Sequence, residues 1–188
     1  MVLWDPEANA VIETATAVLL ARFPYIPGYL TFREGPAVLA AFAGLSRRPT
    51  AVLFDGQGIA HPRRFGLAAH LGLWLGLPSV GVAKSHFCGE AEEPGPAPGD
   101  ATPLHDGDEL LGAVLRTRLR CRPLYVSPGH LLSVPAALRL TLAACRGHRL
   151  PEPTRQAHLA VNRLRREAGA VDPAPAPDGG AGKPPPLW

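Results

Sequence analysis

Asp55 and Lys84 are the first residues whose type and position suggest chemistry, because each directly follows a short apolar run. Asp55 follows the run 51–54, and Lys84 follows the run 79–83. Side chains at the carboxyl ends of strands in open α/β sheets emerge into the crevice where ligands bind. A carboxylate at Asp55 therefore suits a metal ligand. An aspartate before glycine also commonly caps its own turn, and a lysine at a strand end is commonly only solvated.

Glu34 is a second candidate carboxylate, and it lies two residues before Pro36. Proline fits the first turn of a helix, and Glu34 would then lie at the start of that helix. A glutamate in this position is favoured by the helix dipole without any further role. Glu34 therefore becomes a site candidate only in combination with other residues.

The positive charge of the chain is concentrated in one segment. Residues 1–115 carry seven basic and twelve acidic residues, whereas residues 116–166 carry eleven basic residues and one acidic residue. A basic block in an otherwise acidic chain is typical of a partner with a phosphate backbone, because neutralising phosphates releases their counterions. A solvated helical face rich in arginine would give the same count, and charge alone does not separate the two.

The elements that must position these residues follow from hydrophobic periodicity. The runs at 51–54 and 79–83, separated by a helical stretch at 65–75, predict a strand, helix and strand crossover with a parallel pair. A proline-led turn at Asp5-Pro6-Glu7 predicts a hairpin of 2–4 with 11–20. Apolar residues at helical spacing predict further helices at 36–45, 134–145 and 154–166, and short apolar runs predict strands at 110–116 and 124–126.

Composition limits the organisation of the chain. Its 188 residues, 46% of them hydrophobic, can bury one core, so we expect one domain over 1–167. Residues 168–188 hold six prolines and four glycines and predict a disordered tail, and the stretch 90–103 predicts a mobile surface loop. No run is long enough for a membrane span and no signal peptide is evident, so we expect a cytoplasmic protein. Three scattered cysteines predict neither disulfides nor a zinc site.

Several longer motifs follow one another in a fixed order. They are Pro24-Tyr25-Ile26-Pro27-Gly28, Phe32-Arg33-Glu34-Gly35-Pro36, Phe54-Asp55-Gly56-Gln57-Gly58-Ile59-Ala60-His61-Pro62-Arg63, Gly81-Val82-Ala83-Lys84-Ser85, Tyr125-Val126-Ser127-Pro128-Gly129-His130 and Pro151-Glu152-Pro153-Thr154-Arg155-Gln156-Ala157-His158. In this order and register the chain resembles the endonuclease V family from about Val2 to Glu167. The resemblance implies an α/β fold with a ribonuclease H-like mixed sheet flanked by helices.

The same resemblance implies a function. Members of this family are endonucleases that nick DNA at the second phosphodiester bond 3′ of a deaminated adenine, with Mg²⁺ as the cofactor and Mn²⁺ as a substitute. Magnesium prefers oxygen ligands and stabilises charge on phosphate and leaving oxygen. We therefore expect a monomeric DNA-repair enzyme whose partner is DNA containing deoxyinosine. Some relatives act on inosine in RNA, so the choice between DNA and RNA stays open.

Site residues carry over position by position. Asp55, Glu34 and His158 match the metal ligands of the family, and Lys84 matches its active-site lysine, which contacts the phosphate or orients the attacking water. Taken singly, His158 would more often be a partly buried packing residue.

The resemblance also implies residues that bind the nucleic acid. Tyr25, Ile26 and Pro27 match the wedge that enters the duplex while the damaged nucleotide is turned out, at an unstacking cost of a few kcal/mol. Without the resemblance this segment would be an ordinary rigid loop. Residues expected to line the base pocket are Gly28, Leu30, Gly66 and Leu67. Residues expected to contact phosphate are Arg33, His61, Arg63 and Arg64.

One element of the family pattern has no match here. Members carry a first catalytic aspartate, typically in Gly-Val-Asp, on a central strand that lies upstream of the predicted hairpin. Asp5 cannot replace it, because it occupies the hairpin turn. We therefore expect a chain shortened at its amino terminus, with the true start upstream, and the other explanation is a product that is naturally shortened. The alternatives are a relative that binds deaminated nucleic acid without cutting it, and a fragment that does not fold alone.

Overall fold

The structure is a computed structural model that describes residues 1–167 and residue 169. Apart from residue 169, the predicted tail lies outside the described residues. The described strands are β1 (Val2–Asp5), β2 (Ala10–Thr14), β3 (Val52–Phe54), β4 (Ser79–Ala83), β5 (Ala101–Asp106), β6 (Glu109–Leu115) and β7 (Leu124–Pro128). The described helices are α1 (Leu30–Ala43), α2 (Leu67–Leu75), α3 (Val134–Ala143) and α4 (Glu152–Glu167).

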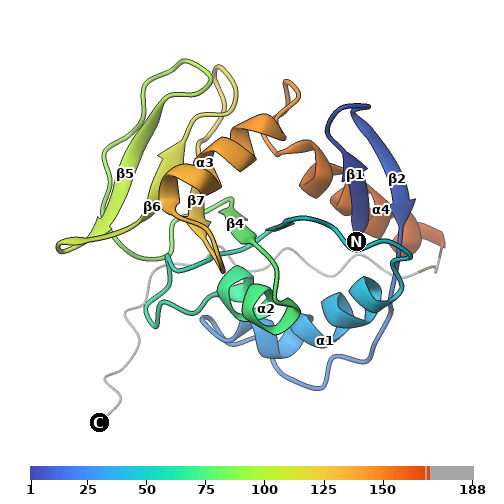
Figure 1. The fold of residues 1–188 in the computed structure, drawn as a ribbon. Helices are drawn as coiled ribbons and strands as arrows, with labels where there is room; N and C mark the ends of the chain where they lie inside the picture. The colour runs from blue at the N-terminus through green and yellow to red at the C-terminus, as the bar shows by residue number, and fades with distance from the viewer. Residues whose placement is uncertain (168, 170–188) are drawn as a thin grey trace, which may run out of the picture.

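A five-stranded mixed sheet with the order β3-β4-β7-β6-β5 forms the centre of the fold. β3 and β4 are parallel, joined through α2, and the other neighbours in this sheet are antiparallel. β1 and β2 form a separate hairpin that stands beside α4 (Figure 1). The predicted crossover and the predicted mixed sheet flanked by helices are therefore confirmed.

The two faces of the sheet are covered by different helices, because side chains alternate along each strand. Val52 and Phe54 pack with α2 in one cluster, onto which α1 also packs. Val80 and Val82 face the other way and pack with Ala137 of α3. The carboxyl ends of β3 and β4 are thus fixed between two packed layers (Figure 1).

α1 begins six residues earlier than the periodicity predicted, and Pro36 lies inside it rather than in its first turn. A proline within a helix costs one backbone hydrogen bond. Packing of Leu30, Val38, Leu39 and Phe42 of α1 against the α2 cluster offsets this loss. Glu34 therefore lies in the second turn of α1, where the dipole at the helix start no longer accounts for it.

The hairpin and the loop over 90–103 also differ from the prediction. β2 ends at Thr14 instead of residue 20, and the segment after it leaves Val18 and Leu20 exposed. The predicted loop ends at Asp100, because 101–106 form the edge strand β5, where a proline (Pro103) is tolerated.

The loop before β5, which the composition predicted to be mobile, makes hydrogen bonds and an ion pair with neighbouring residues. Arg116 donates to the carbonyls of Gly95 and Pro94 and pairs with Glu93 at 2.6 Å. The Thr102 hydroxyl also donates to the carbonyl of Glu92 at 2.5 Å. These contacts hold the loop against β5 and against Arg116, the residue that follows β6.

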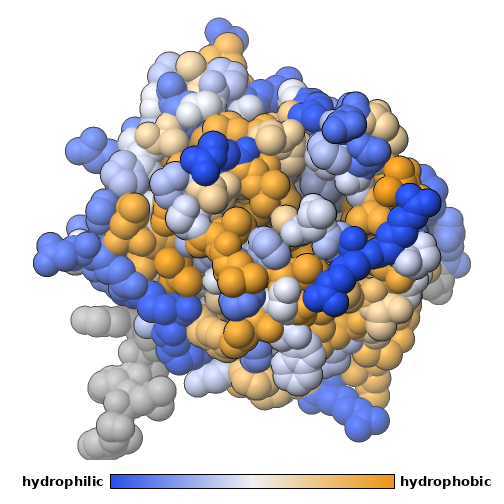
Figure 2. Space-filling model, in the orientation of Figure 1, coloured by the Kyte–Doolittle hydropathy of each residue, from blue (hydrophilic) through white to orange (hydrophobic). Residues whose placement is uncertain are grey.

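None of the helices that the structure describes is long and apolar enough to cross a membrane. On the face seen in Figure 1, apolar residues form patches across the middle, and hydrophilic residues lie both between these patches and at the rim (Figure 2). Cys88, Cys121 and Cys145 are free thiols, as predicted.

Glu152, at the start of α4, gives a prediction about pH. Its side chain is 9% exposed and accepts from Arg155 and Gln156, and these bonds, chiefly that of Arg155, hold the pKa of Glu152 at about 2. Because this pKa lies below its ordinary value of 4.5, the stabilisation is present above pH 4.5 and is lost as the pH falls toward 2. We expect Glu152→Gln to lower the melting temperature at neutral pH.

Thermal unfolding of both proteins between neutral and acidic pH measures this effect. The difference in melting temperature should shrink as the pH falls below 4.5, while Glu92→Gln, a change at an exposed glutamate, should show no such trend. A difference for Glu152→Gln that is independent of pH would contradict the assignment.

Candidate active site

Asp55 and Lys84 form an ion pair at the edge of the sheet where β3 and β4 end. Lys84 Nζ donates to Asp55 Oδ2, and the two side chains are 46% (Asp55) and 38% (Lys84) exposed. The parallel register of β3 and β4 places both residues at the same edge, Asp55 one position beyond Phe54 and Lys84 three positions beyond Gly81, the partner of Phe54. The predicted neighbourhood of these two residues is therefore present, with each accessible to a ligand.

Glu34 of α1 is the second carboxylate near this edge. Desolvation by the surrounding protein raises the pKa of Glu34, and the negative charge of Asp55 raises it further. Two carboxylates close enough to interact are costly unless a cation lies between or beside them. Lys84 neutralises part of the negative charge of the two carboxylates, and a bound cation would neutralise the rest.

The three predicted metal ligands do not form one cluster. Among the residues that the structure describes, no group of three His, Cys, Asp or Glu side chains could hold a metal ion. His158 is exposed on α4, a helix that contacts β1, β2 and β3. Magnesium is commonly held by one or two carboxylates, with waters and substrate phosphates completing its shell. Asp55 and Glu34 fit such a site by themselves.

The loop after Asp55 is packed tightly onto the sheet. Gly58 N donates to Ser127 Oγ at 2.8 Å, and Ile59 N donates to the carbonyl of Pro128 at 2.8 Å. A Cβ atom on Gly58 would overlap that carbonyl, and a Cβ atom on Gly81 would overlap the backbone of Gly58. These glycines allow the loop to lie directly on β4 and β7, which fixes Asp55.

This close packing predicts a large effect of a small change. Gly58→Ala should destabilise the protein by about 1–3 kcal/mol, because the backbone atoms around the new methyl group cannot yield. Thermal unfolding measures the change, with Gly44→Ala as the matched control, since a Cβ atom there meets only ordinary contacts from 3.4 Å. Equal melting temperatures for the two variants would show that the loop is looser than described.

The predicted wedge is an exposed turn held at both ends. Tyr25 is 65% and Ile26 is 40% exposed, and Tyr29 N closes the turn by donating to the Ile26 carbonyl at 2.9 Å. On one side, Arg33 donates to the carbonyl of Phe23 at 2.8 Å. On the other side, Gly28 takes a positive φ of 81°. The turn thus presents apolar side chains on a fixed support.

The predicted base-pocket residues come together around the loop after Asp55. Gly66 N donates to the Gly58 carbonyl at 2.9 Å, and a Cβ atom on Gly56 would contact Leu67. Leu30 packs against the same cluster as Leu67. The carbonyl of Gly28 is joined to this region by hydrogen bonds from the side chains of His61 and Arg63.

The residues predicted to contact phosphate make hydrogen bonds within the protein. His61 is 3% exposed, its Nε2 donates to the Gly28 carbonyl at 3.2 Å, and its Nδ1 accepts from Arg63 N at 3.1 Å. Burial, then the charge of Arg63, lowers the pKa of His61, in keeping with the neutral ring that these two contacts require. Arg63 also donates to the Gly28 carbonyl and lies 4.1 Å over the Tyr29 ring.

Arg64 is likewise occupied, because it pairs with Asp106 and Glu109, each at 2.7 Å. Arg33 holds the wedge turn through Phe23. In this conformation these four residues brace the wedge and the loops through internal bonds, and their contact with an external phosphate stays a prediction. Sequence could not show these internal bonds, because three of the partners, Gly28, Asp106 and Glu109, are remote along the chain.

Comparison with known proteins decides the family. The Endonuclease V family model matches residues 1–159, which include every predicted site residue. Endonuclease V of Xanthomonas oryzae pv. oryzae (strain PXO99A) is 51% identical over 172 residues, covering 91% of this chain and 73% of that protein. The chain belongs to the endonuclease V family. Its relatives are nucleases, hydrolases that act on phosphodiester bonds.

Solved endonuclease V structures share the fold. The crystal structure of Endonuclease V from Streptomyces avermitilis has a TM-score of 0.74 and 47% identity, covering 80% of this chain and 66% of that one. The chain thus spans slightly less than two thirds of that relative. Ciona intestinalis Endonuclease V, solved in complex with a 24mer DNA containing an inosine followed by a ribo-adenosine, has a TM-score of 0.74 and 25% identity, covering 87% and 76%.

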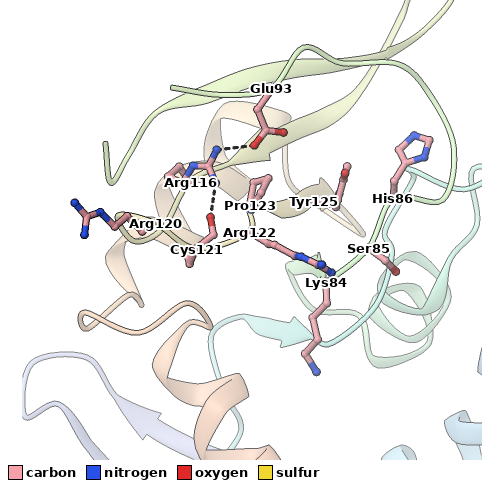
Figure 3. A pocket seen from close by; sticks show the side chains of 10 residues that line it. All are labelled: Lys84, Ser85, His86, Glu93, Arg116, Arg120, Cys121, Arg122, Pro123 and Tyr125. Carbon is pink, nitrogen blue, oxygen red and sulfur yellow. Dashed lines mark hydrogen bonds and ion pairs between the residues drawn. The ribbon is translucent and has the colours of Figure 1, made fainter. Parts of the chain in front are cut away.

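This endonuclease V chain also has a basic pocket for which the sequence predicted no site. It lies between the residues that follow β4 and the turn that joins β6 to β7, and it begins at Lys84 (Figure 3). The sequence feature that could have indicated this pocket is the alternation of arginines at 116, 118, 120 and 122, which contributed only to the net charge of the basic block.

Proposed function

We propose that this chain is a magnesium-dependent endonuclease that nicks DNA at the second phosphodiester bond 3′ of a hypoxanthine base, in the repair of deaminated adenine. One observation carries the proposal. The edge of a rigid sheet holds Asp55 paired with Lys84, and Glu34, whose pKa responds to Asp55, lies near the pair. The inosine-containing DNA bound by the Ciona relative supports the same substrate for this chain.

The residues present fit the chemistry of a divalent metal ion. When bound, Mg²⁺ or Mn²⁺ would supply charge stabilisation for the reacting phosphate and an activated water. Asp55 and Glu34 would hold it by oxygen ligands, and His158 on α4 stays a proposed third ligand. Lys84 orients Asp55 and is sufficiently exposed to contact a phosphate oxygen.

The wedge and the base pocket would act before the chemical step. Tyr25, Ile26 and Pro27 would fill the gap in the stack, and their braced turn reduces the entropy lost on insertion. Gly28, Leu30, Gly66 and Leu67 surround a loop whose backbone groups could read a base edge that is turned out. Since all of these residues come from one chain, we propose that the protein acts as a monomer. We also propose that it acts in the cytoplasm.

Cleavage of a labelled duplex tests the proposal. In the presence of Mg²⁺, a duplex with one deoxyinosine should give a single nick beyond the lesion, and an undamaged duplex or added EDTA should give none. A matched strand with inosine in RNA measures the preference between the two nucleic acids. Retention of the inosine duplex without product at any Mg²⁺ or Mn²⁺ concentration would instead show a binding protein and overturn the proposal.

A further inference from the structure

The basic pocket beside Lys84 is the strongest unassigned feature of the molecule. It is a cavity of about 580 Å³, open to solvent, and three segments line it, one of them the loop before β5 through Glu93. Lys84, Ser85 and His86 come from the end of β4, and Arg120 and Arg122 come from the turn between β6 and β7. Because Lys84 belongs to both, the pocket is continuous with the Asp55–Lys84 pair.

Two arginines of the pocket are available for a ligand. Within the part of the chain that the structure describes, the side chains of Arg120 and Arg122 make no hydrogen bond or ion pair. Arg116, by contrast, is fully engaged by Glu93, the loop carbonyls and the carbonyl of Cys121. Arg122 extends toward the Lys84 and Ser85 segment, and Arg120 points outward at the far end (Figure 3).

The backbone of the turn that carries these arginines is preorganised. Arg120 adopts a φ of 57°, a left-handed conformation that is costly for residues with a side chain. Contacts on either side hold it, since Arg116 donates to the Cys121 carbonyl and Cys121 Sγ donates to the Arg118 carbonyl at 3.0 Å. The backbone of the turn therefore needs little ordering when a ligand binds.

Arg149 joins the two walls of the pocket. Its Nε donates to the carbonyl of Arg122 at 2.8 Å, and its Nη2 donates to the carbonyls of Lys84 and Pro123, each at 3.0 Å. Gln57, from the loop after Asp55, holds the carbonyl of Ser85 at 3.1 Å. The distance between the arginine turn and the active edge is therefore fixed by the fold.

We infer that this pocket binds backbone phosphates of the cut nucleic-acid strand, next to the phosphate at the active edge. Unpaired guanidinium groups in a fixed turn suit phosphate oxygens, to which arginine donates in a fork. The ring of Tyr125 beside His86, with centroids 5.5 Å apart, adds a surface on which a base could stack. This inference rests on the proposed function for the identity of the strand.

Removal of the two free charges tests the pocket. The double variant Arg120→Gln with Arg122→Gln should raise KM for the deoxyinosine strand about tenfold and leave kcat unchanged, because these groups bind substrate away from the reacting atoms. The slope of log Kd against log salt for a fluorescent single-stranded oligonucleotide should fall by about 1.4, the value for two phosphate contacts on a single strand.

A matched variant separates the pocket from overall charge. Arg118→Gln with Arg139→Gln removes the same charge from two exposed arginines that do not line the pocket and whose side chains have no described partner, and it should change both values much less. Equal effects of the two double variants would overturn the inference. Thermal unfolding of each variant checks that the fold is kept.

Cleavage and the salt dependence of binding test the proposed function and the pocket separately. If the chain does not cut the deoxyinosine strand, the proposed function fails, while the salt slope with undamaged oligonucleotide still decides whether the pocket binds phosphate. If the chain cuts normally and the pocket variant has an unchanged KM and salt slope, only the pocket assignment fails.

Discussion

Asp55→Asn is expected to lower cleavage of a deoxyinosine duplex by at least about 100-fold, because loss of partners around a metal ligand already costs 10–100-fold. The asparagine keeps the size of the side chain and its bond from Lys84 but removes the negative charge. The turn over 55–58 is held by Gly58 and Ser127, so the fold should persist. Single-turnover cleavage at increasing Mg²⁺ concentrations measures the change.

Two further measurements make this test specific. Asp108→Asn, a change at an exposed aspartate in the turn between β5 and β6, should cleave normally. The pKa of Glu34 should fall in the Asp55→Asn variant, because the charge of Asp55 contributes to raising it. Full activity of the Asp55→Asn variant would remove Asp55 from the active site, whatever the behaviour of Glu34.

Lys84→Met should lower kcat about 10²–10³-fold, the usual effect of removing one group that stabilises charge in a transition state. Methionine retains the length of the side chain and its apolar packing but removes the cation between Asp55 and the basic pocket. Affinity for the divalent metal should not fall, because a competitor for the Asp55 carboxylate has been removed. Metal titration of the two variants therefore distinguishes the two roles.

Lys84→Arg is the control for this prediction. It keeps the charge near Asp55 and should lose less activity than Lys84→Met. A Lys84→Met variant that loses metal affinity in parallel with Asp55→Asn, with kcat restored at saturating metal, would assign Lys84 to positioning Asp55 and not to the reacting phosphate.

Much of the fold could be predicted because local patterns determine strand direction and burial. The short apolar runs before Asp55 and Lys84, with one helix between them, predicted a parallel pair. A parallel pair places the residues that follow its strands at one edge, so the neighbourhood of Asp55 and Lys84 followed from sequence. The early start of α1 did not, because its first turn lacks a capping side chain and depends on packing of Leu30.

The sequence by itself determined the family, through ordered motifs, and the candidate chemistry at Asp55, Glu34 and Lys84. Only the tertiary structure decided which polar side chains remain available. Sequence motifs mark residue types, but a donor is free only if no distant partner satisfies it. His61 and Arg63 are bound by Gly28 across more than thirty residues, so they brace the wedge. Among the described residues the Arg122 side chain has no such partner, and it lines a pocket.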